Sequence, residues 1–462
     1  MRRKDSAMDV RGISPNQEKT GEPARDRLNL TVLGVCTGTG LGHLDCALVQ
    51  FGQNSPSAPL RVKLQQFDQI PIPASVRDPV VNYLRSGRHK SKPAPHLEDL
   101  LGRLFSSGIK AFCRKNALEA ASIDLVGTHS NVLRLLNTRA NSDGVREHPV
   151  HWNAIVTSET GISTVFDFTT IERGVVRRHI HPTSYVDRLF LRHPTKFRVC
   201  LNIDELANLS FIPAHGDDGA RATISRDCGP GSLFIDYAIR YCTSNDQSED
   251  HDGKMGSLGK VNQDIVDRYL DAHDPFRQLP PISIATEMFG DHEAQQLIDE
   301  CLYSSMSEAD TIATITRITA QNILKQYQRL LELFFPPGQE VDELFICGPS
   351  ARNSNIIDYL EAGFPEGVIT KPLHDIGIPG DAHEAVCYAH LALEAVLSQA
   401  TQAAGTPPAP SSAYPNADAV RARVVPGRRW NELLSHVLEF SGGQRLYFAT
   451  NVRIAGSFEA AV

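Results

Sequence analysis

The sequence LNLTVLGV at residues 28–35 leads into TGTGLG at 37–42 and then into LDCALVQF at 44–51. The first and last runs are rich in β-branched and aliphatic residues, and the glycines between them break that pattern. This stretch therefore predicts a strand, a glycine turn and a second strand. A third β-like run, Leu60 to Ile70, would complete an antiparallel meander.

A similar order of segments returns in the second half of the chain. Three β-like runs, Arg198 to Ile203, Leu206 to Ile212 and Thr223 to Asp227, precede a helix-like segment that starts at Ser232. This repetition predicts two related lobes. The remaining segments follow helix or strand patterns at residues 96–117, 125–129, 310–334, 343–346, 355–362 and 382–399. We therefore expect an α/β protein with mixed sheets.

A chain of 462 residues is longer than a single hydrophobic core normally supports, so we expect more than one domain. The predicted parts are a disordered polar tail at 1–27, an N-terminal lobe at 28–195, a C-terminal lobe at 196–399, and a connection rich in Pro, Ala and Ser that leads into a C-terminal segment at 400–462. An amphipathic helix, without an assigned function, is predicted at Trp430 to Phe440.

The composition is that of a globular protein, with 41% hydrophobic and 22% charged residues. A net charge of -8 gives no general attraction to nucleic acid, so any phosphate ligand must be held by local geometry. No run is long enough to cross a bilayer, and we expect no membrane partner. The nine cysteines are scattered without a C-x-x-C pair, which predicts reduced thiols in the cytoplasm.

The sequence DCGPGSLFID at 227–236 is the main candidate for chemistry. It sets the carboxylate of Asp227 at the end of a β-prone run, immediately before Gly229, Pro230 and Gly231. Glycines let backbone N–H groups approach a ligand closely, and a helix N-terminus attracts phosphate. Asp227 is therefore a candidate general base beside an anion-binding loop. Taken alone, the same residues also fit a tight turn with a solvated acid.

Three other segments carry weaker signals. The glycine turn at 37–42 could hold a phosphate or form an ordinary hairpin, and it is not a Walker A loop because no Gly-Lys-Ser/Thr follows. The segment Cys347 to Asn353 joins a strand to a helix and fits a nucleotide contact or a plain loop equally well. Asp250 to Gly253 resembles the start of a calcium loop but lacks its later ligands, so a capping or turn role is predicted.

Metal-binding residues are not predicted. The 17 histidines form no standard zinc spacing with cysteine. His129 stands at a predicted strand end, where a purely structural role is one interpretation.

In this order the segments resemble the anhydro-N-acetylmuramic acid kinase family, sugar kinases of the actin and hexokinase-like ATPase superfamily. The resemblance runs from about Leu28 to about Leu397, and the ordered set rather than one motif carries it. It implies a two-lobed, actin-like ATPase fold with ribonuclease H-like units and a cleft between the lobes. The matching stretches are residues 34–49, 127–134, 202–210, 227–236, 250–261, 310–323, 347–357 and 377–389.

The resemblance also implies roles for individual residues. Asp227 takes the place of the acid that activates water to open the anhydro bridge, while the sugar oxygen receives the phosphoryl group of ATP. Magnesium is implied between the phosphates. The nucleotide contacts implied are Gly38, Thr39, Gly40, Gly229, Pro230, Gly231, Gly348 and Asn353, and the sugar contacts are His129 and Glu384.

This chain departs from the family pattern at ligand-facing positions. Gly40 and Gly42 stand where the family has a serine and an aspartate, and Asp204 and Glu205 stand where it has two glycines. Carboxylates at that point would repel phosphates or recruit a metal. The family's Gly-Gly-Gln-Gly-Ala-Pro and Lys-Ser-Thr-Gly-Arg-Glu segments are not retained.

We therefore expect a divergent ATP-dependent sugar kinase of amino sugar metabolism whose substrate is an amino sugar or anhydro-sugar. The alternative is a catalytically degenerate protein of the same fold that acts as a sugar sensor or partner-binding module. The oligomeric state stays open, with a homodimer as one option.

Overall fold

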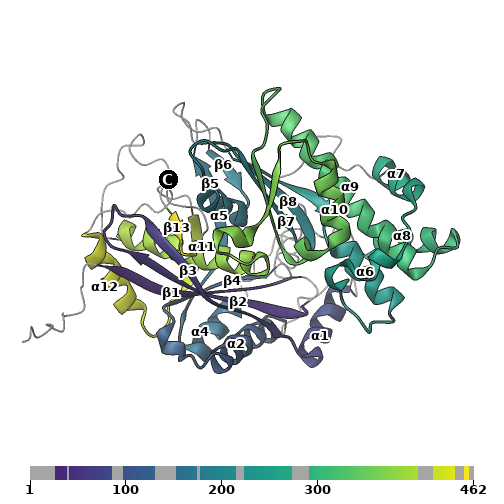
Figure 1. Ribbon diagram of the computed structural model, residues 1–462. Coiled ribbons are helices and arrows are strands. Elements are labelled where there is room, and N and C mark those ends of the chain that lie inside the picture. The colour runs from purple at the N-terminus through teal and green to yellow at the C-terminus, as the bar shows by residue number, and fades with distance from the viewer. Residues whose placement is uncertain are drawn as a thin grey trace, which may run out of the picture.

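The chain is described from a computed structural model. The residues described are 27–38, 41–85, 97–130, 152–173, 177–214, 223–272, 291–403, 420–442 and 452–456. The predicted polar tail, apart from Arg27, lies outside these residues. Two β-sheets with helices on their faces make up the described structure, which confirms the α/β class with mixed sheets (Figure 1).

The first sheet contains eight strands in the order β12-β5-β4-β1-β2-β3-β13, with β6 beside β5. Its strands β1 to β3 form the predicted antiparallel meander, and β4 and β5 continue the sheet in parallel with β1. The strand bounds are β1 Leu28–Thr37, β2 His43–Gln53, β3 Leu60–Pro71, β4 Leu125–Ser130, β5 Ser163–Arg173, β6 Arg177–Ile180, β12 Val420–Val425 and β13 Val452–Ile454.

The second sheet contains five strands in the order β11-β10-β7-β8-β9. β7, β8 and β9 are antiparallel neighbours, whereas β10 and β11 run parallel to β7. The core order of the first sheet, β5-β4-β1-β2-β3, is therefore repeated with the same strand directions, as the repeated sequence pattern predicted. The strand bounds are β7 Arg198–Ile203, β8 Leu206–Ile212, β9 Ile224–Pro230, β10 Glu343–Cys347 and β11 Ile369–Pro372.

The helices predicted from periodicity are present, together with others that the sequence pattern did not reveal. α2, α6, α9, α10, α11 and α12 match predicted segments. The bounds are α1 Ala74–Arg85, α2 Leu97–Lys115, α4 Trp152–Thr160, α5 Pro182–Phe190, α6 Leu233–Cys242, α7 Gln263–Ala272, α8 Asp291–Tyr303, α9 Glu308–Phe334, α10 Ser354–Gly363, α11 His383–Ala403 and α12 Trp430–Ser441.

Strand β1 is buried on both faces. Leu33 and Val35 face the core that includes α2 and α4, whereas Val32 faces a core shared with α11. Glycines allow α11 to lie directly on the sheet: a Cβ on Gly34 would collide with the carbonyl of Ala385 on α11. In Figure 1, α11 and the α2–α4 pair accordingly lie on opposite sides of this sheet.

Helix α11 contacts both β-sheets. The sequence boundaries assign it to the C-terminal lobe, yet it packs mainly against β1 and β4 of the first sheet. Its core also includes Cys200, Phe345 and Cys347 from the second sheet. The C-terminal strands β12 and β13 extend the first sheet as well. The lobe boundaries 28–195 and 196–399 stay a prediction.

Candidate active site

Asp227 lies within β9, three residues before the strand ends at Pro230. Its side chain is only 6% exposed, and its Oδ1 accepts a hydrogen bond of 2.8 Å from Nδ2 of Asn208 on β8. Asn208 and Asp227 are paired across the two antiparallel strands. The strand pairing therefore fixes the carboxylate, and the reading of Asp227 as part of a solvated turn does not fit its burial.

The orientation of Asn208 is set by hydroxyl groups on its other side. Its Oδ1 accepts hydrogen bonds of 3.2 Å from Ser184 on α5 and from Ser210 on β8, so its Nδ2 must turn toward Asp227. Asn208 is thus a positioning residue that sequence reasoning did not single out. The sequence feature that could have suggested Asn208 is its place at the end of the family-like segment 202–208. Only the strand pairing shows that Asp227 is its partner.

The loop Gly229-Pro230-Gly231 is packed tightly against the turn between β7 and β8. A Cβ on Gly231 would collide with the carbonyl of Asp204, so glycine is required there. The N–H groups of Gly231 and Leu233 donate to the carbonyl of Glu205 at 2.9 and 3.3 Å, and Ser232 N–H donates to the carbonyl of Asp204 at 2.8 Å. The N–H groups before and at the N-terminus of α6 therefore donate to protein carbonyls. The sequence had led us to expect that they point at a phosphate.

Gly38, at the end of β1, faces the same turn from the first sheet. A Cβ on Gly38 would lie 2.8 Å from Oε1 of Glu205. Thr39 and Gly40, the other predicted phosphate contacts of this loop, lie outside the described residues. Gly42 is exposed, and a Cβ there would meet nothing within 4 Å, so the aspartate found in the family would fit.

Gly348 brings a third predicted ligand loop to the β7–β8 turn. It has φ of +92°, and a Cβ would lie 2.6 Å from both Asn202 Oδ1 and the carbonyl of Ile203. Its N–H donates to the carbonyl of Gly380 at 3.2 Å. Asn353, another predicted contact, also caps α10, because its Oδ1 accepts the N–H of Asn355 at 3.1 Å.

Several carboxylates meet around this turn. Burial and the adjacent charge of Glu205 raise the pKa of Asp204 to about 7. Burial, followed by the charges of Asp204 and Asp45, raises the pKa of Glu384 to about 8. Asp45 also lies 3.3 Å from Nε2 of His43. Burial is the larger cause of both shifts and the neighbouring carboxylates add to it, so a cation here would stabilise the ionised forms.

The two predicted sugar contacts are linked through α11. The ring of His129, on β4, stacks on Tyr388 with centroids 4.4 Å apart and an angle of 14° between the planes. Tyr388 lies one helical turn after Glu384 on α11. The structure therefore places His129 and Glu384 on neighbouring elements, with His129 held by the aromatic stack.

The segment that resembles a calcium loop is a capped turn, as predicted. Oδ1 of Asp250 accepts the N–H of Met255 at 2.8 Å, and Oδ2 accepts the N–H of Gly256 at 3.0 Å. Asp381 forms an ion pair with Arg352, which closes the loop after β10 over the start of α11.

Together, the turn Ile203-Asp204-Glu205 contacts three of the predicted ligand loops, at Gly38, Gly231 and Gly348. Asp227 lies on β9, the strand that leads into one of these loops. The repeated strand order, 3-2-1-4-5 in each sheet, matches the expected actin-like ATPase fold.

The chain belongs to the anhydro-N-acetylmuramic acid kinase family, whose family model matches residues 30–409. A relative with that name from Caldanaerobacter subterraneus subsp. tengcongensis is 27% identical over 369 residues, which cover 79% of this chain and 90% of the relative. Another from a Picosynechococcus species is 28% identical, with 79% and 92% covered. The family and the expected class of ATP-dependent sugar kinase are thereby confirmed.

Solved structures similar to this chain are more distant. Component A of the (R)-2-hydroxyglutaryl-CoA dehydratase from Acidaminococcus fermentans is 11% identical with a TM-score of 0.38, and covers 79% of this chain and 97% of its own. A ROK family glucokinase from Streptomyces griseus, solved with glucose and AMPPNP, is 12% identical with a TM-score of 0.34, over 79% of this chain and 99% of its own. Among the described residues, no helix has both the length and the apolar character needed to span a membrane.

Proposed function

We propose that this protein is an ATP-dependent kinase that opens an anhydro-sugar with water and phosphorylates the oxygen released. The acceptor is an anhydro-sugar or a related amino sugar. The observation that carries this proposal is the buried carboxylate of Asp227 on β9, held by Asn208 on β8, in a chain whose curated relatives are named anhydro-N-acetylmuramic acid kinases.

Asp227 is the general base of the reaction. It takes a proton from water as the water oxygen bonds to the anomeric carbon of the sugar, and the bond from that carbon to the bridging oxygen breaks. The freed oxygen then bonds to the γ-phosphorus of ATP, and ADP leaves. A base fixed by a second residue keeps its lone pair aimed at the water, which is what such proton transfer requires.

Glu384 and His129 are the proposed sugar contacts. Because its pKa is raised to about 8, Glu384 carries a proton near neutral pH and donates a hydrogen bond to a sugar oxygen. The ring of His129 is held by its stack on Tyr388. The proposed nucleotide contacts are Gly38, Thr39, Gly40, Gly229, Pro230, Gly231, Gly348 and Asn353. The N–H of Gly231 and the Oδ1 of Asn353 already have partners in the protein, so these two residues would contact the nucleotide through other atoms.

The oxygen-rich surroundings of the β7–β8 turn fit Mg²⁺, which prefers carboxylate and phosphate oxygens. We propose that Asp204 and Glu205, the two acids at positions where the family pattern has glycines, would bind the magnesium ion. Bound there, Mg²⁺ neutralises charge on the phosphates. The raised pKa of Asp204 supports this choice, because a nearby cation would stabilise its ionised form.

A second candidate is a degenerate family member that senses a sugar or binds a partner without catalysis. One observation favours it: the N–H groups of Gly231, Ser232 and Leu233 donate to protein carbonyls, which leaves them unavailable to a phosphate. In that case nucleotide with magnesium would not stabilise the fold, whereas binding of a sugar would.

The test is a coupled ADP-release assay with Mg-ATP and a panel of anhydro- and amino sugars. The proposal predicts ADP release that depends on one class of sugar. ADP release at the same rate without sugar would indicate an ATPase instead. Absence of turnover, together with absence of a nucleotide-induced thermal shift in a folded sample, would favour the degenerate protein.

We further propose a cytoplasmic location, because none of the nine cysteines is in a disulfide and eight of them are buried. The net charge of -8 argues against nucleic acid as a partner. A homodimer is the oligomeric state to test first, by light scattering of the purified chain.

A further inference from the structure

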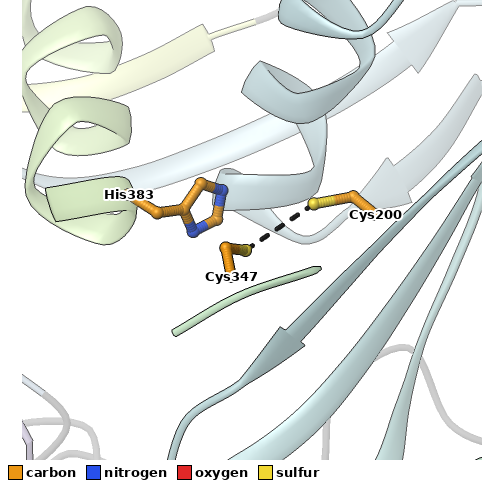
Figure 2. A group of neighbouring side chains, drawn as sticks. All are labelled: Cys200, Cys347 and His383. Carbon is orange, nitrogen blue, oxygen red and sulfur yellow. Dashed lines mark hydrogen bonds between the residues drawn. The ribbon is translucent and has the colours of Figure 1, made fainter. Parts of the chain in front are cut away.

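A group of soft metal ligands lies in the core between the two sheets, apart from the residues assigned to the reaction. Cys200 comes from β7, Cys347 from the end of β10 and His383 from the start of α11 (Figure 2). Each is at most 1% exposed, and one ligand atom from each lies within 4.8 Å of the others. Figure 2 shows the two sulfurs and the imidazole ring pointing toward one another.

The spacing of the two sulfurs is that of a shared metal. Sγ of Cys200 and Sγ of Cys347 are 3.8 Å apart. Two thiolates bound to tetrahedral zinc, each with a bond of about 2.3 Å, have their sulfurs about 3.8 Å apart. The structure therefore holds the sulfurs too far apart for a disulfide and at the separation that zinc requires.

His383 has the second interaction expected of a metal-binding histidine. Its Nε2 lies 2.6 Å from Oδ1 of Asp187 on α5, so the carboxylate fixes the ring and favours a proton on Nε2. Its Nδ1 is buried and has no hydrogen-bond partner among the described residues. Metal-bound imidazoles commonly donate their other N–H to a carboxylate, and an unsatisfied buried nitrogen is otherwise costly.

We propose that Cys200, Cys347 and Nδ1 of His383 bind one zinc ion, with Asp187 as the carboxylate that orients the histidine. Two thiolates and an imidazole favour zinc over magnesium or calcium. The fourth position is completed by water or by Oδ1 of Asn202, which lies 3.7 Å from Sγ of Cys347.

A second group, Asp187, His383 and Cys387, shares the same histidine but does not suit a metal. The distance of 2.6 Å between Nε2 of His383 and the carboxylate is that of a hydrogen bond. Two such ligands on one tetrahedral zinc, with bonds of about 2.0 to 2.2 Å, would lie about 3.4 Å apart. Cys387, whose Sγ lies 3.5 Å from Nε2, is therefore outside the zinc shell and serves as a control.

The position of the site gives the ion a structural role. It joins two strands of the second sheet to α11, which packs on the first sheet. Cys347 is followed by Gly348 and His383 by Glu384, so the ion fixes the backbone beside a proposed nucleotide contact and a proposed sugar contact. Sequence spacing could not reveal it, because the ligands come from segments that are far apart in the chain.

The test is the metal content of the full-length protein after expression with zinc and gel filtration. We expect about one zinc per chain, and the cobalt-substituted protein should show the thiolate-to-cobalt absorption band of a tetrahedral site. Cys200→Ser, Cys347→Ser and His383→Gln should each lower zinc content at least tenfold. Cys387→Ser should keep it. Circular dichroism would confirm that each variant is folded.

Wild-type protein that binds no zinc or cobalt after reduction would overturn the proposal. So would loss of zinc in Cys387→Ser, because the ion would then sit on the other side of the histidine. A Cys200–Cys347 disulfide found by mass spectrometry in protein purified without reductant, with no bound metal, would likewise contradict it. Activity is not needed for any of these results, so they do not depend on the proposed kinase reaction.

Discussion

Gly38, at the end of β1, lies against Glu205 of the β7–β8 turn, so that a Cβ on Gly38 would be 2.8 Å from Oε1 of Glu205. This contact joins the first sheet to the second at the loop expected to hold phosphates. The resemblance described above implies glycine where this chain has Glu205. Either it repels the nucleotide or it works through a cation.

Replacement of Glu205 separates these two outcomes. Glu205→Gly should tighten ATP binding about tenfold without magnesium, because one negative charge near the phosphates is removed. With magnesium the gain should shrink or reverse, because Glu205 is a proposed ligand of the ion. Calorimetry with ATP, with and without MgCl₂, measures both values. An identical gain under both conditions would remove Glu205 from the magnesium site.

Asp204 makes stability depend on pH in a predictable direction. The pKa of Asp204 is about 7 in the folded chain, whereas its ordinary value is 3.8. Between about pH 4 and 7 the folded chain therefore keeps a proton on Asp204 that the unfolded chain has lost. Its contribution to stability is therefore present at low pH and lost as pH rises through 7. Asp204→Asn should raise the free energy of unfolding by on the order of 1 to 3 kcal/mol at pH 8, and by less at pH 5.

Urea unfolding of the wild type and of this variant at both pH values measures the effect. Asp246→Asn, at an exposed position, is the matched control and should change stability little at either pH. A variant at Asp204 that is less stable than wild type at pH 8 would show that the ionised carboxylate is satisfied in the fold, contrary to this account.

Gly231 and Gly42 differ in the space around them. A Cβ on Gly231 would collide with the carbonyl of Asp204, whereas a Cβ on Gly42 would meet nothing within 4 Å. Gly231→Ala should lower the free energy of unfolding by about 1 to 3 kcal/mol, because the β7–β8 turn must move. Gly42→Ala should change it by less than about 1 kcal/mol. Thermal melts of both variants measure the two changes in stability. Equal losses of stability in Gly231→Ala and Gly42→Ala would contradict the close packing of Gly231.

Asn208 should matter for turnover more than for binding. Asn208→Ala leaves Asp227 without the donor that orients it, so kcat should fall by about tenfold to a hundredfold while the Kd for nucleotide stays within about twofold. Asn116→Ala is a matched control, because Asn116 donates a similar hydrogen bond of 2.7 Å to Asp68 on β3 of the first sheet, whereas Asn208 and Asp227 are in the second sheet. An equal loss of kcat in both variants would make the effect a general one on folding.

The segments that carry strong patterns were predicted well. β1 and β2 are apolar, β-branched runs separated by a glycine turn, and α9 has a long apolar stripe, so element type follows from local chemistry. The repeated strand order could also be expected from the repeated pattern. β5 and α5 were not predicted, because their apolar residues are interrupted by polar and charged ones whose partners are far away in sequence.

The site was only partly accessible to sequence reasoning. Asp227 and Glu384 stand in recognisable segments, so resemblance could suggest them. Their surroundings depend on tertiary contacts: Asn208 becomes a positioning residue only through strand pairing, and α11 reaches the first sheet only because Gly34 leaves room for the carbonyl of Ala385. Periodicity predicts that α11 is a helix, but not which sheet it covers.

The most direct test of the central claim is to follow the oxygen of water during turnover. The protein is incubated with Mg-ATP and an anhydro-sugar in ¹⁸O-enriched water, beside Asp227→Asn, and the products are analysed by mass spectrometry. The account predicts ¹⁸O in the sugar phosphate, none in inorganic phosphate, and a loss of product in the variant by at least a hundredfold. Label in inorganic phosphate, or labelled sugar formed equally well by the variant, would contradict it.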